Sequence, residues 1–171
     1  MKIYTRTGDS GDTAALSGRR LKKDDALIEA YGTLDELNSV LGLAAAFCKR
    51  KRTRSMLSAA QKDVFEIGAS LWKGEELLSG NRTTKRLEKE IDSLEGRLRP
   101  LKHFILPSGT KEACLLHVAR SACRRAERRL VSAKVEGDRL AYLNRLSDLL
   151  FVLARFENAK KGVGEELWKG K

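Results

Sequence analysis

The chain has 171 residues, of which 42% are hydrophobic and 33% charged, and its formal net charge at pH 7 is +11. This composition indicates a soluble globular protein, most simply a single domain over residues 1–171, and excludes a disordered chain. The sequence has no apolar run near the roughly 18 residues of a membrane span, and no hydrophobic signal core at its N-terminus. We therefore expect a cytoplasmic protein with no membrane partner.

The positive charge indicates an anionic partner, which is either a nucleic acid or a phosphate-rich small molecule. The three cysteines (Cys48, Cys114 and Cys123) form no CxxC pair, and the two histidines are far apart in the sequence. This pattern favours buried, reduced thiols and predicts no metal site built from protein side chains.

The chain opens with YTRTGDSGDT at residues 4–13, a segment of hydroxyls and glycines with little to bury. Glycines allow backbone N–H groups to point at a ligand, and hydroxyls add further donors, which suits a phosphate group. The segment is predicted to be a loop. A disordered N-terminus is the plainer alternative.

Five segments repeat apolar residues at steps of three and four, which predicts amphipathic helices. The first is capped by Asp24 or Asp25 and continues through Ala44 to the basic stretch CKRKRTRS, which is expected to turn the chain. The second covers about 53–73, and the third begins at Thr83 or Thr84 and ends before Pro100. The fourth covers about 110–133 and the fifth about 138–161. Short connections predict an all-α, five-helix up-down bundle.

Two further segments are predicted to be ordered rather than free. HFILPSGT at residues 103–110 combines an apolar cluster with Pro107 and a glycine, which favours an ordered loop. The tail GVGEELWKGK at residues 162–171 contains Trp168, which predicts that the tail docks on the bundle.

The fourth helix carries ARSACRRAERRL at residues 119–130. At about 100° per residue, Arg120, Arg124, Glu127 and Arg128 share a face that borders the apolar stripe, whereas Arg125 and Arg129 point away. Such a face would meet another surface. A solvated basic helix with i,i+4 pairing explains the same spacing about as well.

Polar residues also follow one stripe of the fifth helix, beside its leucines: Asn144, Asp148, Phe151 and Arg155. On the first helix, GTLDELN places Asp35 three residues before Asn38. A polar helix face without further role is the alternative in both places.

Six motifs occur in a fixed order along the chain: TRTGDSGDT, KKDD, YGTLDELNS, FILPSG, ARSACRRAER and LNRLSDLLFVLAR. Together they closely resemble the PduO-type ATP:cob(I)alamin adenosyltransferases. The match spans nearly the whole chain, from Tyr4 to the final segment with Trp168. The resemblance implies a five-helix bundle that forms a homotrimer, with ATP bound between neighbouring subunits. It also implies transfer of the 5′-deoxyadenosyl group from ATP to the cobalt of cob(I)alamin or a corrinoid precursor, with Mg²⁺ and release of triphosphate.

The resemblance also implies roles for single residues. It implies a triphosphate-binding loop formed by Thr5, Arg6, Thr7, Gly8, Asp9 and Thr13, with Lys23 as a further phosphate contact. Nucleotide-binding residues on the neighbouring subunit would be Arg124, Glu127, Arg128 and Asn144. Arg124 and Arg128 would act on the leaving group, and Phe104 would displace the lower cobalt ligand. Asp35 and Arg120 match a pair that forms a salt bridge between subunits.

A cobalamin reductase or an adenosylcobalamin-dependent enzyme is the partner that this activity implies, and no nucleic acid is expected. The competing hypothesis is a basic helical bundle that binds nucleic acid or acts as an adaptor. That hypothesis explains the charge but gives no reason for the order of the six motifs. Salt-sensitive DNA binding without ATP affinity would favour it.

Overall fold

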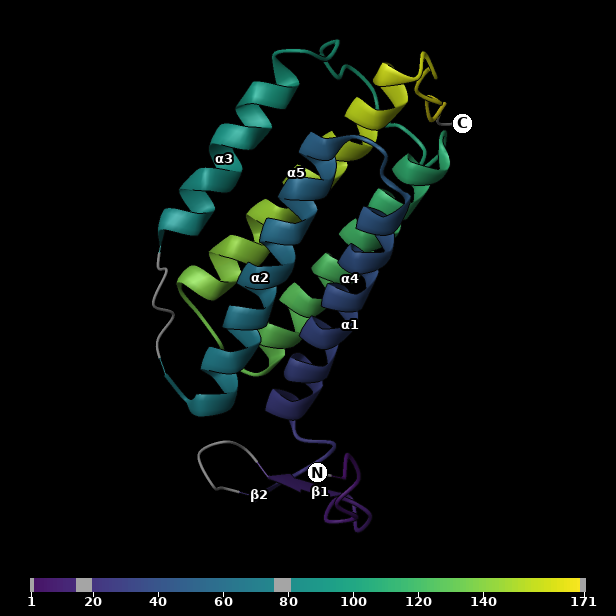
Figure 1. The fold of residues 1–171 in the computed structure, drawn as a ribbon. Helices are drawn as coiled ribbons and strands as arrows, with labels where there is room; N and C mark the ends of the chain where they lie inside the picture. The colour runs from purple at the N-terminus through teal and green to yellow at the C-terminus, as the bar shows by residue number, and fades with distance from the viewer. Residues whose placement is uncertain (1, 15–19, 76–80, 170–171) are drawn as a thin grey trace.

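The computed structural model describes residues 2–14, 20–75 and 81–169 of the chain. These residues form five α-helices and one antiparallel hairpin, whose strands are β1 (Asp12–Ala14) and β2 (Arg20–Lys22). The helices are α1 (Ala26–Phe47), α2 (Lys51–Lys73), α3 (Asn81–Glu95), α4 (Lys111–Ser132) and α5 (Asp138–Lys160). Successive helices alternate in direction, so the predicted up-down bundle is confirmed (Figure 1).

The core lies where the apolar stripes of the helices meet. α1 packs on α2 and α4, and α5 packs on α3 and α4. The largest fully buried side chains come from all five helices and include Leu37, Ile67, Leu94, Leu116 and Leu146. No helix of the described residues is long and apolar enough to cross a membrane.

Two predicted helix starts are confirmed by side-chain caps. The Asp25 carboxylate accepts a hydrogen bond of 2.8 Å from the Leu27 amide at the start of α1. The Thr110 hydroxyl accepts one of 3.2 Å from the Ala113 amide at the start of α4. Both caps satisfy backbone donors that have no partner within the helix.

Other predicted boundaries were wrong by a few residues. α2 begins at Lys51, so most of the basic stretch is helical and residues 48–50 alone turn the chain. α3 begins at Asn81, because Thr83 and Thr84 face the core as part of its first turn. α3 also ends earlier than expected: after Glu95 the backbone tightens, and the Leu98 amide bonds to the Glu95 carbonyl.

The predictions for the opening loop, the polar connector and the tail had different outcomes. The opening segment is not all loop, because Thr13 lies in β1 opposite Leu21 of β2. The polar connector at 73–84 includes residues 76–80, which lie outside the described residues. The tail docks as predicted, since Ile105 and Leu167 form an isolated antiparallel bridge.

The cysteines are reduced, and two of the three are buried as expected. Cys48 and Cys123 are buried, whereas Cys114 is half-buried at the start of α4. Burial raises the pKa of the Cys48 thiol to about 12, and the nearby Glu157 acts in the same direction. Both effects disfavour the thiolate.

Candidate functional site

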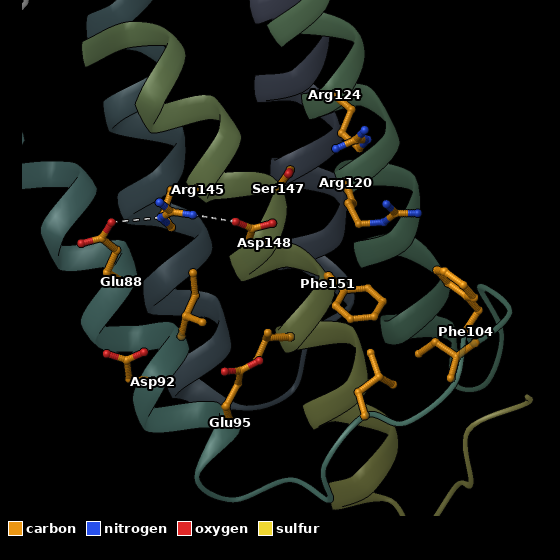
Figure 2. Close-up of a pocket in the computed structure, with 14 residues that line it drawn as sticks. Glu88, Asp92, Glu95, Phe104, Arg120, Arg124, Arg145, Ser147, Asp148 and Phe151 are labelled. Atoms are coloured by element: carbon orange, nitrogen blue, oxygen red, sulfur yellow. Dashed lines mark hydrogen bonds and ion pairs between the residues drawn. The ribbon is translucent and has the colours of Figure 1, made fainter. Parts of the chain in front are cut away.

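A groove of about 760 Å³ opens between α3 and α4, with α5 as its floor. α3 and α4 both pack on α5, which leaves the outer face of α5 open between them (Figure 2). One wall is acidic and comes from α3, the other is basic and comes from α4, and the loop after α3 closes one end. The lining includes Glu88, Asp92, Glu95, Phe104, Arg120, Arg124, Arg145, Asp148 and Phe151.

The predicted face of α4 is present, and it continues past the groove into a second, smaller cavity. Arg124 lines both, and the second cavity of about 280 Å³ adds Glu127, Arg128 and Asn144. The Asn144 side-chain amide donates a hydrogen bond of 3.0 Å to the Glu127 carboxylate, which joins α5 to α4. The structure therefore brings together four of the residues that the sequence grouped.

Charge on α4 is divided between two faces. Arg125 pairs with Glu36, and Arg129 pairs with Glu29, so both of these arginines point away from the cavity face, as predicted, and toward α1. Arg124 and Arg128 are exposed, and neither forms an ion pair within the described part of the chain. The cavity face of α4 thus keeps positive charge free for an anionic ligand.

Arg120 lies deeper in the groove, and its guanidinium carbon is 5.9 Å from the centre of the Phe151 ring. Its Nε is buried and has no hydrogen-bond partner among the described residues. Asp35 is exposed on α1 and lines a different, apolar depression between α1 and α2. The predicted pair of Asp35 and Arg120 is therefore not formed within one chain.

A buried histidine lies behind the groove. His117 is 4% exposed, and its ring packs edge-on against Phe151 with the ring centres 6.1 Å apart. Burial lowers the pKa of His117, and the positive charge of Arg120 lowers it further. Both causes favour the neutral imidazole.

The opening loop is ordered by its own contacts. The Thr5 and Thr7 hydroxyls lie 2.8 Å apart, and Arg20 of β2 donates a hydrogen bond of 3.0 Å to the Thr7 carbonyl. Lys23 reaches the same turn, because a Cβ added to Gly8 would lie 3.4 Å from its ammonium nitrogen. The predicted phosphate contacts Thr7, Gly8 and Lys23 are thus neighbours.

The rest of the loop is turn and strand. Arg6 takes a positive φ of 61°, and the Asp9 amide lies 3.4 Å from the Arg6 carbonyl oxygen. Thr13 lies in β1, one residue from the ion pair of Asp12 with Lys22. The whole segment extends beyond the N-terminal end of α1 (Figure 1). None of its described residues lines the groove or the smaller cavity beside Asn144.

Phe104 is 79% exposed and lines the groove from the loop after α3. Its ring meets the Trp168 ring edge-on, with the centres 6.3 Å apart. The Phe104 carbonyl accepts a hydrogen bond of 2.9 Å from the Trp168 amide. The loop after α3 and the tail, which were predicted separately to be ordered and docked, therefore pack against each other.

Sequence reasoning missed the acidic wall of the groove. Arg145 bridges Glu88 of α3 and Asp148 of α5, with distances of 3.1 and 2.9 Å (Figure 2). The hydrogen bonds that Arg145 donates, first to the Asp148 carboxylate and then to that of Glu88, raise the pKa of Arg145. The charged surface of α3 gave no local signal for this wall, because the bridge depends on which helix lies opposite. No described residues form a group of three or more His, Cys, Asp or Glu side chains that could hold a metal ion.

Comparisons with known proteins match both the sequence and the fold. A family profile described as cobalamin adenosyltransferase matches residues 3–157. The corrinoid adenosyltransferase of Bacillus subtilis is 42% identical over 96% of this chain and 91% of its own length. The corrinoid adenosyltransferase PduO of Citrobacter freundii is 42% identical over 92% of this chain, which spans about 50% of that relative.

A solved structure from Lactobacillus reuteri superposes with a TM-score of 0.93 and 34% identity, covering 99% of this chain and 100% of the other. It is a variant PduO-type ATP:corrinoid adenosyltransferase complexed with cobalamin and ATP. A second variant from the same organism, complexed with ATP, superposes with a TM-score of 0.91 and 35% identity, covering 98% of this chain and 100% of the other.

Proposed function

The chain belongs to the cobalamin adenosyltransferase family, and on that premise we propose that it transfers the 5′-deoxyadenosyl group of ATP to the cobalt of a reduced corrinoid. The observation that carries the proposal is the face of α4 whose Arg124 and Arg128 form no ion pair with the described residues, and which opens into a groove bordered by the exposed ring of Phe104. The face suits a polyphosphate, and the groove offers space for a large, flat substrate. The comparisons do not support the nucleic-acid-binding or adaptor alternative.

The reaction needs positioning and charge stabilisation rather than a general base. Cob(I)alamin supplies the electron pair that forms the cobalt–carbon bond at C5′, while the bond between C5′ and the triphosphate oxygen breaks. The triphosphate leaves with that bond's electron pair, and the cobalt ends as Co(III). The protein must hold C5′ in line with the cobalt and stabilise the charge that develops on the leaving triphosphate.

We propose that the triphosphate lies between two subunits. The opening loop of one subunit would supply Thr5, Arg6, Thr7, Gly8, Asp9, Thr13 and Lys23. The neighbouring subunit would supply Arg124 and Arg128, while its Asn144 and Glu127 orient the nucleoside. None of the described loop residues lines the cavity that holds Arg124 and Arg128 of the same chain, which supports this division. A homotrimer with an Asp35–Arg120 pair at each interface completes the proposal.

Mg²⁺ would accompany the nucleotide and neutralise charge on the phosphates. Because the described residues hold no protein cluster for the ion, its ligands would be phosphate oxygens and water with at most one loop carboxylate such as Asp9. Asp12 is the less suitable candidate, since its hydrogen bond with Lys22 already holds it and lowers its pKa.

We propose that the corrinoid enters the groove of α3, α4 and α5, with its lower face against Phe104. A ring in that position keeps the lower ligand off the cobalt. The lower ligand is an axial donor that stabilises Co(II) more than Co(I). Its removal therefore raises the reduction potential of the Co(II)/Co(I) couple. An external electron donor, such as a cobalamin reductase, then supplies the one electron that converts Co(II) to Co(I).

One assay tests the activity directly. Cobalamin is reduced chemically to the Co(I) state and mixed with the protein and Mg-ATP, and the absorption spectrum is followed for adenosylcobalamin. We expect product and triphosphate in equal amounts, and no product without ATP. No product under these conditions, together with salt-sensitive binding to DNA, would overturn the proposal. We also predict a cytoplasmic location and an adenosylcobalamin-dependent enzyme as the recipient, to be tested by fractionation and copurification.

A further inference from the structure

The sequence places Arg155 on the polar stripe of α5, but in the structure its side chain does not line the groove with the other residues of that stripe. Asp148 and Phe151 line the groove, but Arg155 is only 4% exposed and lies outside both cavities. A buried arginine is costly unless its donors are satisfied. Its contacts therefore indicate what it does.

Arg155 joins three separate segments of the chain. Its Nε donates a hydrogen bond of 2.5 Å to the Glu165 carboxylate in the tail, and the pair is an ion pair. Its Nη2 donates a hydrogen bond of 2.8 Å to the Arg99 carbonyl, where the loop after α3 begins. The planar guanidinium thus fixes the tail and the loop to the rigid body of α5 at once.

Beyond these contacts, the tail and the loop pair with each other. The Leu106 amide donates a hydrogen bond of 2.8 Å to the Glu166 carbonyl, and the Trp168 amide donates one of 2.9 Å to the Phe104 carbonyl. Ile105 lies between them, bridged to Leu167. The backbone from Phe104 to Leu106 is therefore held by residues that directly follow Glu165.

The Phe104 ring itself has little to hold it. It is 79% exposed, and Trp168, the ring that meets it edge-on, is itself 55% exposed. The direction of the ring is consequently set by its backbone and by the tail rather than by packing in the core. Small shifts in such a support displace the ring that it carries.

We propose that Arg155 is a positioning residue for Phe104, acting through Glu165 and the Arg99 carbonyl. The inference rests on the proposed function, because it assigns Arg155 to the step in which the lower ligand is kept off the cobalt. Arg155 touches neither substrate. Its loss leaves the α4 face intact and releases the loop from α5.

The test compares two variants with a benchmark and a control. Arg155→Lys keeps the charge, but one ammonium group cannot reproduce the fixed fork that binds two acceptors. Glu165→Ala removes the acceptor in the tail and leaves the core unchanged. Phe104→Ala is the benchmark for a lost ring. Lys161→Ala is the control, because it breaks the 2.7 Å pair with Glu112 at the same end of α5 without touching the loop or the tail.

Four quantities are measured on the full-length protein: the four-coordinate cob(II)alamin signal with ATP, the ATP dissociation constant, the rates with Co(I) or Co(II) supplied, and the midpoint of thermal unfolding. We expect Arg155→Lys and Glu165→Ala to lower the four-coordinate signal about fivefold or more, in the direction of Phe104→Ala. The rate from Co(II) with a weak reductant should fall more than the rate from Co(I). The ATP dissociation constant should stay within about twofold of that of the unmodified protein. Lys161→Ala should keep the full signal.

Three results would overturn the proposal. An unchanged four-coordinate signal in both variants would remove Arg155 from the positioning of Phe104. A parallel fall of both rates, ATP affinity and unfolding midpoint in both variants would show a purely structural role. If the unmodified protein forms no four-coordinate species although it makes adenosylcobalamin, the role of Phe104 fails and the proposed activity stands.

Discussion

The Asn158 side chain hydrogen-bonds to both sides of Gly109. Its Oδ1 accepts from the Thr110 amide at 2.9 Å, and its Nδ2 donates to the Ser108 carbonyl at 3.0 Å. Gly109 has a φ of 110°, and a Cβ added there would overlap the side-chain amide of Asn158. The last turn of α5 therefore holds the loop at the point where α4 begins.

Gly109→Ala should destabilise the protein by about 2 kcal/mol or more, because the new methyl group meets Asn158 and the positive φ is strained. For a domain of this size that lowers the midpoint of thermal unfolding by about 4–8 °C. Gly137→Ala is a control for φ alone, since its φ is 74° and an added Cβ would meet nothing within 4 Å. If the unfolding midpoint fell equally in Gly109→Ala and Gly137→Ala, the clash with Asn158 would not be the cause of the destabilisation.

Arg124→Ala should lower kcat by at least about 100-fold, because one charged donor to a developing anion contributes on that scale. Arg125→Ala, one residue along α4, removes a side chain that pairs with Glu36 instead, and it should retain activity. Steady-state rates with pre-formed Co(I) and saturating Mg-ATP provide the measurement. Full activity in a folded Arg124→Ala variant would exclude the α4 face from the mechanism.

Reversal of either charge in the proposed interface pair should weaken assembly, and reversal of both should restore it. Asp35→Arg and Arg120→Asp are therefore each expected to shift the proposed trimer toward smaller species in sedimentation velocity, and the double variant is expected to restore it. Glu36→Ala is the control, because this neighbouring carboxylate pairs with Arg125 within the chain. An unmodified protein that is a fully active monomer would exclude the shared site.

The stability of the protein should fall below neutral pH, in part through His117. The pKa of His117 is lowered from its ordinary value of 6.5 by burial, so the folded protein holds it neutral while the unfolded chain takes up a proton. The unfolded state then binds more protons, and stability decreases as the pH falls from 6.5 toward the lower pKa of the folded state.

His117→Leu removes the titrating imidazole, and with it this pH dependence of stability, and places a leucine side chain against Phe151. Between about pH 7.5 and pH 5.5, the midpoint of thermal unfolding should therefore change less in the variant than in the unmodified protein. His103→Leu is the control, because His103 is exposed. Identical slopes for His117→Leu and the unmodified protein would show that His117 does not titrate differently in the two states.

The parts of the fold that depend on local spacing could be predicted from the sequence. Asp25 caps α1 as expected, α4 begins directly after Thr110, close to its predicted start, and the angular arrangement of α4 separates Arg124 from Arg125. The hairpin was missed, because strands of three residues are too short to show an alternating pattern. The interfaces between subunits stay predictions.

Contacts between distant segments could not be predicted. Arg155 shares the spacing of the groove residues, yet it turns to Glu165 and the Arg99 carbonyl because the tail folds back along the loop. Likewise, Arg145 forms an ion pair with Glu88 only because α3 packs beside α5. Helical periodicity assigns a residue to a face, but the partner of that face is set by the tertiary fold.

The edge-on contact of Trp168 with Phe104 gives the chain a built-in optical reporter. The sequence has only two tryptophans, and Trp72 lies in the separate depression between α1 and α2. Trp168 is half exposed beside the groove. A corrin ring absorbs where tryptophan emits, so we expect a corrinoid that binds beside Phe104, as proposed, to quench the Trp168 fluorescence by energy transfer. In a Trp72→Phe background the emission should therefore report occupancy of the groove in real time, without a label and without turnover.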